Sequence, residues 1–387
     1  MTQAIVRPGD RPVLNDWWLD PQVVHLNHGS FGAVRRSTMA HQQHLREEAE
    51  RDPDAWFREL PARVAEARRA VARLLDAPEH ATALVTNASA GVSAVLNSGS
   101  VPAGSQVVVT DHAYGAVEMA VRRFAARHAA EVRTVHVPLD ADASQAAETI
   151  CAALGDRTTL VVLDQITSAT ARVMPVRETA AHCRERGIPL LVDGAHAPGQ
   201  VPDPVAGLAG AYWVGNLHKW WCAPRGAAAL VADTEDHQLL YPPIDSWGAP
   251  DPFPQRFDRQ GTQDLTSWLA APSAVAETED HYGWGAARAH MSALVTYGQQ
   301  YVADRWGARL DGLNPDPAPA MRLVPLPAGI ATNLDSAQAL QRVLADQGYA
   351  TAVTSWQGRG FLRLSAHLYN TAADYEGLAE RWAHLFA

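Results

Sequence analysis

The sequence contains little lysine, little cysteine and no long apolar run, and each shortage excludes a class of protein. Lysine occurs once among 32 basic residues, at Lys219, and the others are arginine. Three cysteines, Cys151, Cys183 and Cys222, form neither a CxxC pair nor a cysteine and histidine cluster with zinc-ligand spacing. We therefore expect reduced thiols and no metal site. No segment reaches the roughly 20 apolar residues of a membrane helix, so we expect a cytoplasmic protein without a membrane partner.

The charge balance argues against a nucleic-acid partner. The formal net charge is -10, and the basic residues are scattered along the chain. Glycine patterns of the type GxxxxGK[ST] or GxGxxG are also missing at the candidate turns, so ATP and NAD are unsupported as ligands. At 387 residues, with 47% hydrophobic residues, the chain is long enough for about two domains.

Between about residues 80 and 232, short apolar runs alternate with amphipathic stretches, which is typical of βαβ units around a mostly parallel sheet. Six runs are predicted strands, at 81–86, 106–111, 159–164, 189–193, 211–215 and 226–231. In open α/β sheets ligands bind beyond the carboxyl ends of the strands. We therefore expect the polar residues at these ends to point into one crevice: Asn87, Asp111, Asp164, Asp193 and Asn216.

The remaining pattern predicts helices around the sheet and a second, smaller unit. Helical stretches are expected at 39–75, with Pro53 and Pro61 as interruptions, at 116–130 and at 176–187. An irregular, aromatic stretch covers 241–264, and a strand at 361–365 and a helix at 371–386 end the chain. We predict a large α/β domain over 25–270, a smaller C-terminal α/β domain over 271–387, and an N-terminal segment, 1–24, that packs on the smaller domain.

Asp193 and Lys219 each follow a buried strand, which brings them to the same edge of the sheet. Pyridoxal 5′-phosphate (PLP) requires this pair, because a lysine amine binds the cofactor as a Schiff base and a carboxylate keeps its pyridine nitrogen protonated. Considered singly, each residue has an ordinary explanation: Asp193 could cap a helix, and Lys219 could be a solvated surface lysine. Trp220 and Trp221 follow Lys219 directly, and two large apolar side chains beside it argue against a solvent-exposed Lys219.

Other segments supply candidate partners for such a cofactor and its substrate. The turn TNASAGVSAVL (86–96) places the N–H groups of Ala88, Ser89 and Ala90 at a helix start, where a phosphate can bind, although capping alone explains the same residues. His112 or Tyr114 could cover the ring face, and Tyr114 could act as an acid or base, but each also reads as a packed loop aromatic. His196 and His218 are candidates for binding cofactor oxygens, and Arg363 is a candidate for binding a substrate carboxylate. The ordinary alternative is that the histidines are packing residues and that Arg363 forms an ion pair with a nearby acid.

Taken together, eight segments resemble class-V aminotransferase-type PLP enzymes, and within them the isopenicillin N epimerase-like branch. These segments are LNHGSFG (26–32), TNAS, TDHAYGA (110–116), LDQITSAT (163–170), LVDGAH, VGNLHKWWCAPRG (214–226), QGTQD (260–264) and LRLSAHLYN (362–370). The resemblance implies a fold-type-I homodimer with a mostly parallel seven-stranded-type sheet, helices on both faces, and an active site shared across the interface. It implies roles for Lys219 as the Schiff-base lysine, Asp193 at the pyridine nitrogen and Arg363 at the substrate carboxylate. It also implies secondary roles for Asn27 in the substrate pocket, Gln165, Ser168 and His196 near cofactor oxygens, His218 beside the phosphate, and Gly261 and Thr262 at the phosphate of the neighbouring subunit.

Several reactions are compatible with this set of residues. We place β-elimination at a C–S bond first, with an amino acid or cysteine S-conjugate of secondary metabolism, such as antibiotic biosynthesis, as substrate, because Lys219 alone can serve as its base. Epimerisation needs a second proton donor, for which Tyr114 is the candidate, and transamination or an oxidative or decarboxylative deamination also stays open. A desulfurase would need a nucleophilic cysteine late in the chain, and none follows Cys222. A regulatory or scaffold dimer without catalysis is the non-enzyme alternative.

Overall fold

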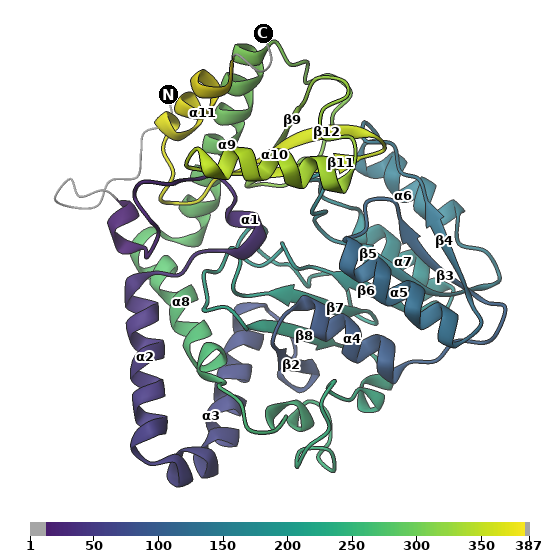
Figure 1. Ribbon diagram of the computed structural model, residues 1–387. Helices are drawn as coiled ribbons and strands as arrows, with labels where there is room; N and C mark the ends of the chain where they lie inside the picture. The colour runs from purple at the N-terminus through teal and green to yellow at the C-terminus, as the bar shows by residue number, and fades with distance from the viewer. Residues whose placement is uncertain (1–12, 384–387) are drawn as a thin grey trace.

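A seven-stranded sheet forms the centre of the larger part of the protein in a computed structural model that describes residues 13–383 (Figure 1). Every neighbouring pair is parallel except those of β8, which runs antiparallel to both of its neighbours. The strands, in spatial order, are β2 (Thr82–Val85), β8 (Ala228–Ala232), β7 (Tyr212–Asn216), β6 (Leu190–Asp193), β5 (Thr158–Asp164), β3 (Gln106–Thr110) and β4 (Glu131–Val135).

The six apolar runs of the sequence all form strands of this sheet, and the mostly parallel α/β architecture is confirmed. Strand β4 escaped the sequence pattern because it lies at the edge of the sheet. Its residues Glu131, Arg133 and Thr134 are exposed, so it shows no buried run.

Helices cover both faces of the sheet. On one face α4 and α5 pack through Val92, Val121 and Phe124 against the sheet, and the other face is covered by α3, α6, α7 and α8. The helices of this part are α2 (Arg36–Arg51), α3 (Pro53–Leu74), α4 (Ala88–Ser98), α5 (Gly115–Arg127), α6 (Ala143–Ala152), α7 (Val176–Glu185) and α8 (Thr266–Tyr282).

The helical stretch predicted at 39–75 is two helices, α2 and α3, which separate at Asp52. The Asp52 side chain accepts a hydrogen bond from the amide of Ala55, and Pro53 occupies the first position of α3, where it loses no helical bond. Pro61, expected to interrupt the helix, lies inside α3 without ending it.

The C-terminal part has its own apolar core around a three-stranded sheet in the order β11, β12, β9. Its strands and helices are α9 (Trp284–Trp306), β9 (Met321–Pro325), α10 (Leu334–Asp346), β10 (Tyr349–Ala350), β11 (Ala352–Trp356), β12 (Arg359–Ser365) and α11 (Ala372–Trp382). This core is distinct from the two clusters of buried residues on the two faces of the central sheet, which supports the predicted division into a large and a small domain. The division itself stays a prediction.

A short N-terminal stretch contacts the C-terminal part. Strand β1 (Val24–His25) pairs in parallel with β10, and Trp17 packs edge-on against His367 and Tyr369. Residues 1–12 of the predicted N-terminal segment lie outside the described residues. After β1 comes α1 (His28–Phe31), a single helical turn in the sequence HGSF.

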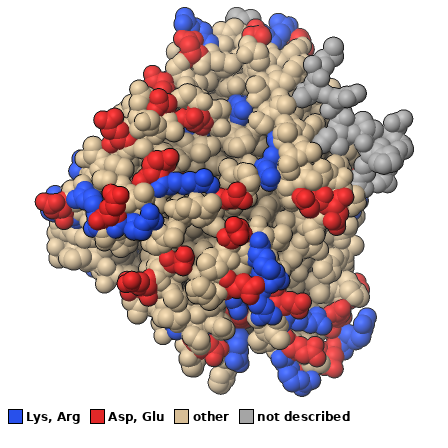
Figure 2. All heavy atoms as spheres, turned by 180° about the vertical axis from the view of Figure 1, so that it is seen from behind, with Lys and Arg blue, Asp and Glu red and all other residues tan. Residues whose placement is uncertain are grey.

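Acidic and basic side chains are interspersed over the face shown in Figure 2, which shows no extended basic surface on that side. No helix within residues 13–383 is both long and apolar enough to cross a membrane.

Candidate functional site

The carboxyl ends of β5, β6 and β7 and the start of α4 meet at a cleft of about 620 Å³. This is the place where an open parallel sheet binds its ligands. Of the residues that the sequence nominated for a cofactor or substrate, the cleft lining contains Ala88, Ser89, Tyr114, Ser168, Asp193, His196, His218 and Lys219.

Lys219 is the only amine among the residues that line this cleft. Burial lowers the pKa of its ammonium group to about 8, although the nearby carboxylate of Asp193 acts in the opposite direction. At pH 7 about a tenth of Lys219 is therefore unprotonated, far more than of an exposed lysine, and this is the nucleophilic form that attacks a carbonyl.

His196 is hydrogen-bonded to this amine. Its Nε2 lies 3.1 Å from Nζ of Lys219, and its Nδ1 lies 3.4 Å from the indole Nε1 of Trp220. An indole N–H only donates, so Nδ1 is the acceptor, and the proton of the neutral ring is on Nε2. Burial holds the pKa of His196 well below its usual range, so the ring stays neutral and donates its Nε2–H to the lone pair of Lys219.

Asp193 and Asp164 are neighbouring carboxylates at the ends of β6 and β5, where their backbones pair in register. Asp193 accepts a hydrogen bond of 2.9 Å from the amide of Ala195, and Asp164 accepts one of 3.3 Å from the amide of Tyr114. Burial raises the pKa of both groups, and the proximity of Asp193 raises that of Asp164 further. Of the two carboxyl groups, Asp193 is therefore the easier one to ionise, and ionisation of Asp164 beside it is less favourable.

The start of α4 is partly satisfied by side-chain amides. Asn216 accepts a hydrogen bond from the Ala88 N–H at 2.8 Å, and Asn87 caps the helix by accepting from the Ala90 N–H, also at 2.8 Å. Among the described residues, no side chain occupies the N–H of Ser89 in this way. A phosphate at this helix start would thus find the amide and hydroxyl of Ser89 as its most accessible donors.

Arg363, on β12, is fully buried and has no acidic partner within residues 13–383. It donates to the carbonyl and hydroxyl oxygens of Ser168 at 2.7 and 3.1 Å, to Oδ1 of Asn27 at 3.1 Å and to Oγ of Ser30 at 3.0 Å. Its Nε has no partner, and burial lowers its pKa to about 10. The sequence left open an ordinary role for Arg363, an ion pair with a nearby acid, and no such pair is present within residues 13–383.

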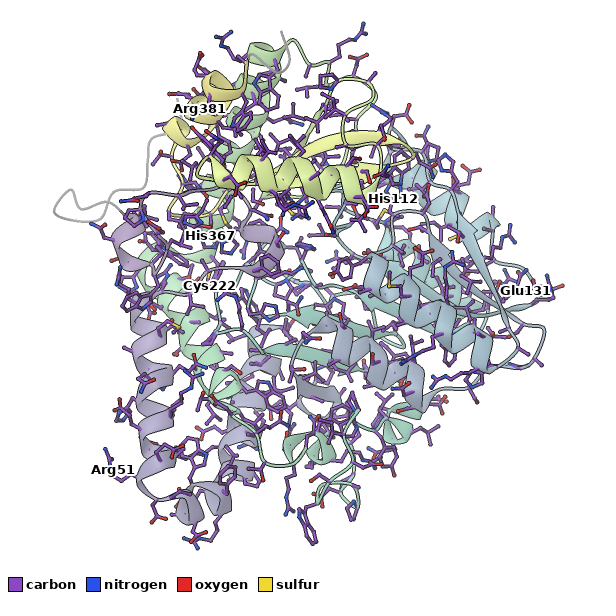
Figure 3. The ribbon with its side chains drawn as sticks, viewed as in Figure 1. Arg51, His112, Glu131, Cys222, His367 and Arg381 are labelled. Carbon is purple, nitrogen blue, oxygen red and sulfur yellow. The ribbon has the colours of Figure 1, made fainter. Side chains whose placement is uncertain are left out.

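Besides Arg363 and Asn27, six residues that the sequence placed at the cleft do not line it: Ala90, Asp111, His112, Gln165, Gly261 and Thr262. His112 donates from Nε2 to the Val137 carbonyl (2.8 Å) and accepts at Nδ1 from the Thr170 hydroxyl (2.7 Å), and its buried ring stacks on Trp356, so neither nitrogen is free for a cofactor. Figure 3 shows His112 well apart from Cys222, the residue three positions after Lys219.

The Gln165 amide is engaged by the indole of Trp213 and the carbonyl of Pro204. Asp111 bonds His136 and Gln357. Gly261 and Thr262 are exposed and do not line the cleft, and their predicted contact with a neighbouring subunit stays a prediction.

Some residues at the cleft received no role from the sequence. Asn87, Asp164 and Asn216 were expected only to point toward it, and the position of each just past a strand was the available signal. Ser30 was not singled out. It follows LNHG in a segment without periodicity, and its bond to Arg363 joins residues 333 positions apart.

Three comparisons place the chain among known proteins. The model of the aminotransferase class-V family matches residues 36–378. An isopenicillin N epimerase of Streptomyces clavuligerus is 32% identical, with 94% of both chains covered. A putative L-cysteine desulfhydrase of Oryza sativa subsp. japonica is 28% identical, with 92% of this chain and 82% of the relative covered. Among solved structures, the cystine C–S lyase C-DES in complex with cysteine persulfide has a TM-score of 0.81 at 18% identity, over 94% of this chain and 98% of the other.

Proposed function

Because this chain belongs to the class-V aminotransferase family, whose members depend on PLP, we propose that it is a lyase that cleaves the C–S bond of an amino-acid conjugate by β-elimination. One observation carries the proposal. The buried guanidinium of Arg363, without a carboxylate partner in residues 13–383, shares Ser168 and Ser30 with the cleft that holds the amine of Lys219. A buried cation without a counter-ion is costly, and an α-amino acid supplies the missing carboxylate.

The donor set of the cleft fits PLP. Lys219 provides the amine, Asp193 an anion for the pyridine nitrogen, and Ser89 at the start of α4 donors for the phosphate. Bound PLP supplies an electron sink for a bond broken at the substrate Cα. We propose that Asn216 and Asn87 help Ser89 by fixing the first turn of α4.

In this proposal the residues divide the work between holding the substrate and moving a proton. Arg363 binds the substrate carboxylate through its terminal nitrogens, in exchange for some of the hydrogen bonds that they donate to Ser168, Ser30 and Asn27. Lys219 accepts the proton from Cα, and the thiolate then leaves from Cβ. His196 keeps the lysine amine unprotonated and oriented before it reacts.

Epimerisation is the second candidate, and the position of Tyr114 favours it. Tyr114 lines the same cleft and is 46% exposed, so its hydroxyl can exchange a proton with solvent. The isopenicillin N epimerase relative supports this alternative, whereas the plant cysteine desulfhydrase supports C–S cleavage. Persulfide chemistry on a protein cysteine is not supported, because burial raises the thiol pKa of Cys183 to about 11 and that of Cys222 to about 12, and it also raises the pKa of the half-buried Cys151. We also propose a cytoplasmic homodimer.

The test is to incubate the PLP-loaded protein with a panel of cysteine S-conjugates and to measure pyruvate and free thiol. The same samples are analysed by chiral chromatography for inversion at Cα. The proposal expects pyruvate and thiol in equal amounts, and Tyr114→Phe should retain the activity. Inversion without pyruvate, lost in Tyr114→Phe, would instead establish the epimerase.

A further inference from the structure

A buried cluster outside the cleft lies against the backbone of Lys219. It consists of His28, Cys222, His367 and Tyr369, whose exposed fractions are 3%, 1%, 0% and 6%. Figure 3 labels two of its members, Cys222 and His367, close to each other. None of the four lines the cleft, and none was assigned a role from the sequence.

The cluster contains metal-ligand chemistry, since ligand atoms of His28, Cys222 and His367 lie within 4.8 Å of one another. Its geometry nevertheless argues for hydrogen bonding. The rings of His28 and His367 stack with a centroid distance of 4.0 Å and an interplanar angle of 17°. Imidazole lone pairs lie in the ring plane, so two nearly parallel stacked rings cannot both point at one ion.

The hydrogen bonds of His28 fix its tautomer. Its Nε2 lies 3.0 Å from the carbonyl oxygen of Lys219, which only accepts, so Nε2 carries the proton and donates it. Its Nδ1 is therefore an acceptor, and the hydroxyl of Tyr369 donates to it at 3.0 Å. Burial lowers the pKa of His28 to about 3, so this arrangement persists at any working pH. Tyr369 thus orients His28, and His28 holds the backbone of Lys219.

Helix α1 connects this bond with the guanidinium site. Asn27, just before α1, and Ser30, inside it, accept hydrogen bonds from Arg363, while His28 of the same turn donates to Lys219. Arg363 and Tyr369 lie six positions apart at the end of the C-terminal part. The C-terminal segment that bears Arg363 and Tyr369 therefore holds α1 in place, and α1 in turn holds the backbone of Lys219 through His28.

We propose that His28, oriented by Tyr369, is a positioning residue that holds the backbone of Lys219 and so aims its amine at a substrate bound by Arg363. The inference rests on the proposed function, because it assumes that Lys219 binds PLP and acts on the substrate. A displacement of a reacting group by about 1 Å can lower a rate by orders of magnitude. A bond that fixes the lysine backbone can therefore matter without touching the substrate.

A pair of amide variants separates the two bonds of His28. In His28→Gln the side-chain amide reaches the position of Nε2 and can still donate to the Lys219 carbonyl. In His28→Asn the amide reaches only the position of Nδ1, next to Tyr369, so the bond to Lys219 is lost. Cys222→Ala is the control for packing. The Cys222 Sγ lies 3.9 Å from Nε2 of His28, so removal of the sulfur opens space in the same cluster without changing either hydrogen bond of His28.

Each variant is loaded with PLP and compared with the wild type by three measurements: the pH titration of the lysine-bound visible band, the split between kcat and KM, and the thermal midpoint. The facing groups that influence this titration, Asp193, Asp164, Arg363 and His196, are unchanged in all variants. For His28→Asn we expect the titration midpoint to move by about 0.5 unit or more and kcat to fall about tenfold, with KM within about twofold. His28→Gln should restore both readouts, Tyr369→Phe should lie between the two amide variants, and Cys222→Ala should lower only the thermal midpoint.

The inference is overturned if His28→Gln is as impaired as His28→Asn, or if Cys222→Ala shifts the band and kcat to the same extent. It is also overturned if the band of His28→Asn matches that of the wild type. A wild-type protein without any lysine-bound band would refute the proposed function itself, so the two failures can be distinguished.

Discussion

At the scale of single residues, two buried basic groups, Lys219 and Arg363, define the chemistry of the site, and neutral partners form hydrogen bonds to both. Lys219 contacts the neutral ring of His196, and Arg363 contacts the oxygens of Ser168, Asn27 and Ser30. Within residues 13–383 neither group forms a salt bridge with a carboxylate, although the charges of Asp193 and Asp164 act on Lys219 from nearby. Both remain available to a substrate that brings a carboxylate and an amine.

The lowered pKa of Lys219 predicts how cofactor loading depends on pH. Only the unprotonated amine attacks the PLP aldehyde, and its fraction grows as pH rises through the pKa. Because burial lowers this pKa to about 8, the loading rate of apo-protein should rise to a plateau with a midpoint near pH 8. Stopped-flow absorbance at several pH values measures the midpoint. A midpoint near that of free lysine would show that the amine is not desolvated.

Replacement of Arg363 should weaken the binding of the substrate carboxylate. A charge-assisted hydrogen bond contributes about 1.5–3 kcal/mol, so Arg363→Leu should lower kcat/KM by about 10- to 100-fold, mainly through KM. Arg363→Lys keeps the charge but loses the two-pronged geometry, and it should recover only part of the loss.

The matched control for this prediction is a substrate analogue without the carboxylate. Wild type should discriminate strongly between the amino acid and its decarboxylated amine, and Arg363→Leu should not. Equal discrimination in both proteins, at equal PLP content, would assign the carboxylate to another residue.

At this scale the strand ends were the clearest signal in the sequence for which residues reach the cleft, and their chemical roles stay predictions. Asp193 and Lys219 follow buried strands, and the cleft contains both. His112 and Tyr114 lie in a loop two positions apart, where no periodicity says which side chain turns inward. In the structure Tyr114 lines the cleft, whereas His112 is bonded to Thr170 and Val137.

At the scale of elements, α1 and the turn that bears Lys219 pack with almost no space between them. Gly32 follows α1 with φ of 64°, and a Cβ added there would lie 1.9 Å from the carbonyl oxygen of His218. Such a contact is impossible without movement of one backbone. The close approach explains why the HGSFG segment ends in glycine.

Gly32→Ala should therefore destabilise the fold and loosen the lysine turn. The left-handed conformation alone costs about 1–2 kcal/mol for alanine, and the clash adds to it. Gly104→Ala is the matched control, because Gly104 has φ of 76° but open space around its Cβ position. Urea unfolding of both variants, with PLP content measured in parallel, should show a larger loss for Gly32→Ala. Equal losses would contradict the close packing.

In the central sheet, the sequence predicted the strands with buried residues and missed β4, which has few. In the C-terminal part it also missed β9, although four of the five residues of that strand are buried. All six apolar runs became strands, whereas β4 has mainly exposed residues, and its place at the sheet edge depends on pairing with β3. Pro61 shows the opposite case, since packing of α3 against α8 keeps the helix continuous through a residue that favours a break.

At the scale of the whole molecule, one irregular segment carries an unusual share of exposed apolar side chains. Leu239, Tyr241, Ile244 and Trp247 are 60%, 43%, 56% and 85% exposed. The segment lies beside Gly261, whose added Cβ would be 3.9 Å from Oγ of Ser246. Exposed apolar residues that cluster in this way are typical of a protein interface. Their place next to Gly261 agrees with the predicted contact of Gly261 and Thr262 with a neighbouring subunit.

Trp247→Glu should therefore weaken a homodimer and, with it, the retention of PLP. Leu334→Glu is the control, because Leu334 is 65% exposed but begins α10, which belongs to the C-terminal part. Sedimentation velocity over a range of protein concentrations measures the change. We expect dissociation in Trp247→Glu alone, and a wild-type monomer at every concentration would refute the shared site.

The central claim is that Lys219 carries the cofactor, and the single lysine of the chain makes it directly testable. The PLP-loaded protein is reduced with borohydride, digested and mapped by mass spectrometry, next to Lys219→Arg treated in the same way. We predict one pyridoxyl group per chain on the peptide that contains Lys219, and none in the variant. A pyridoxyl group found only on the N-terminal amine, or retained in Lys219→Arg, would contradict the account.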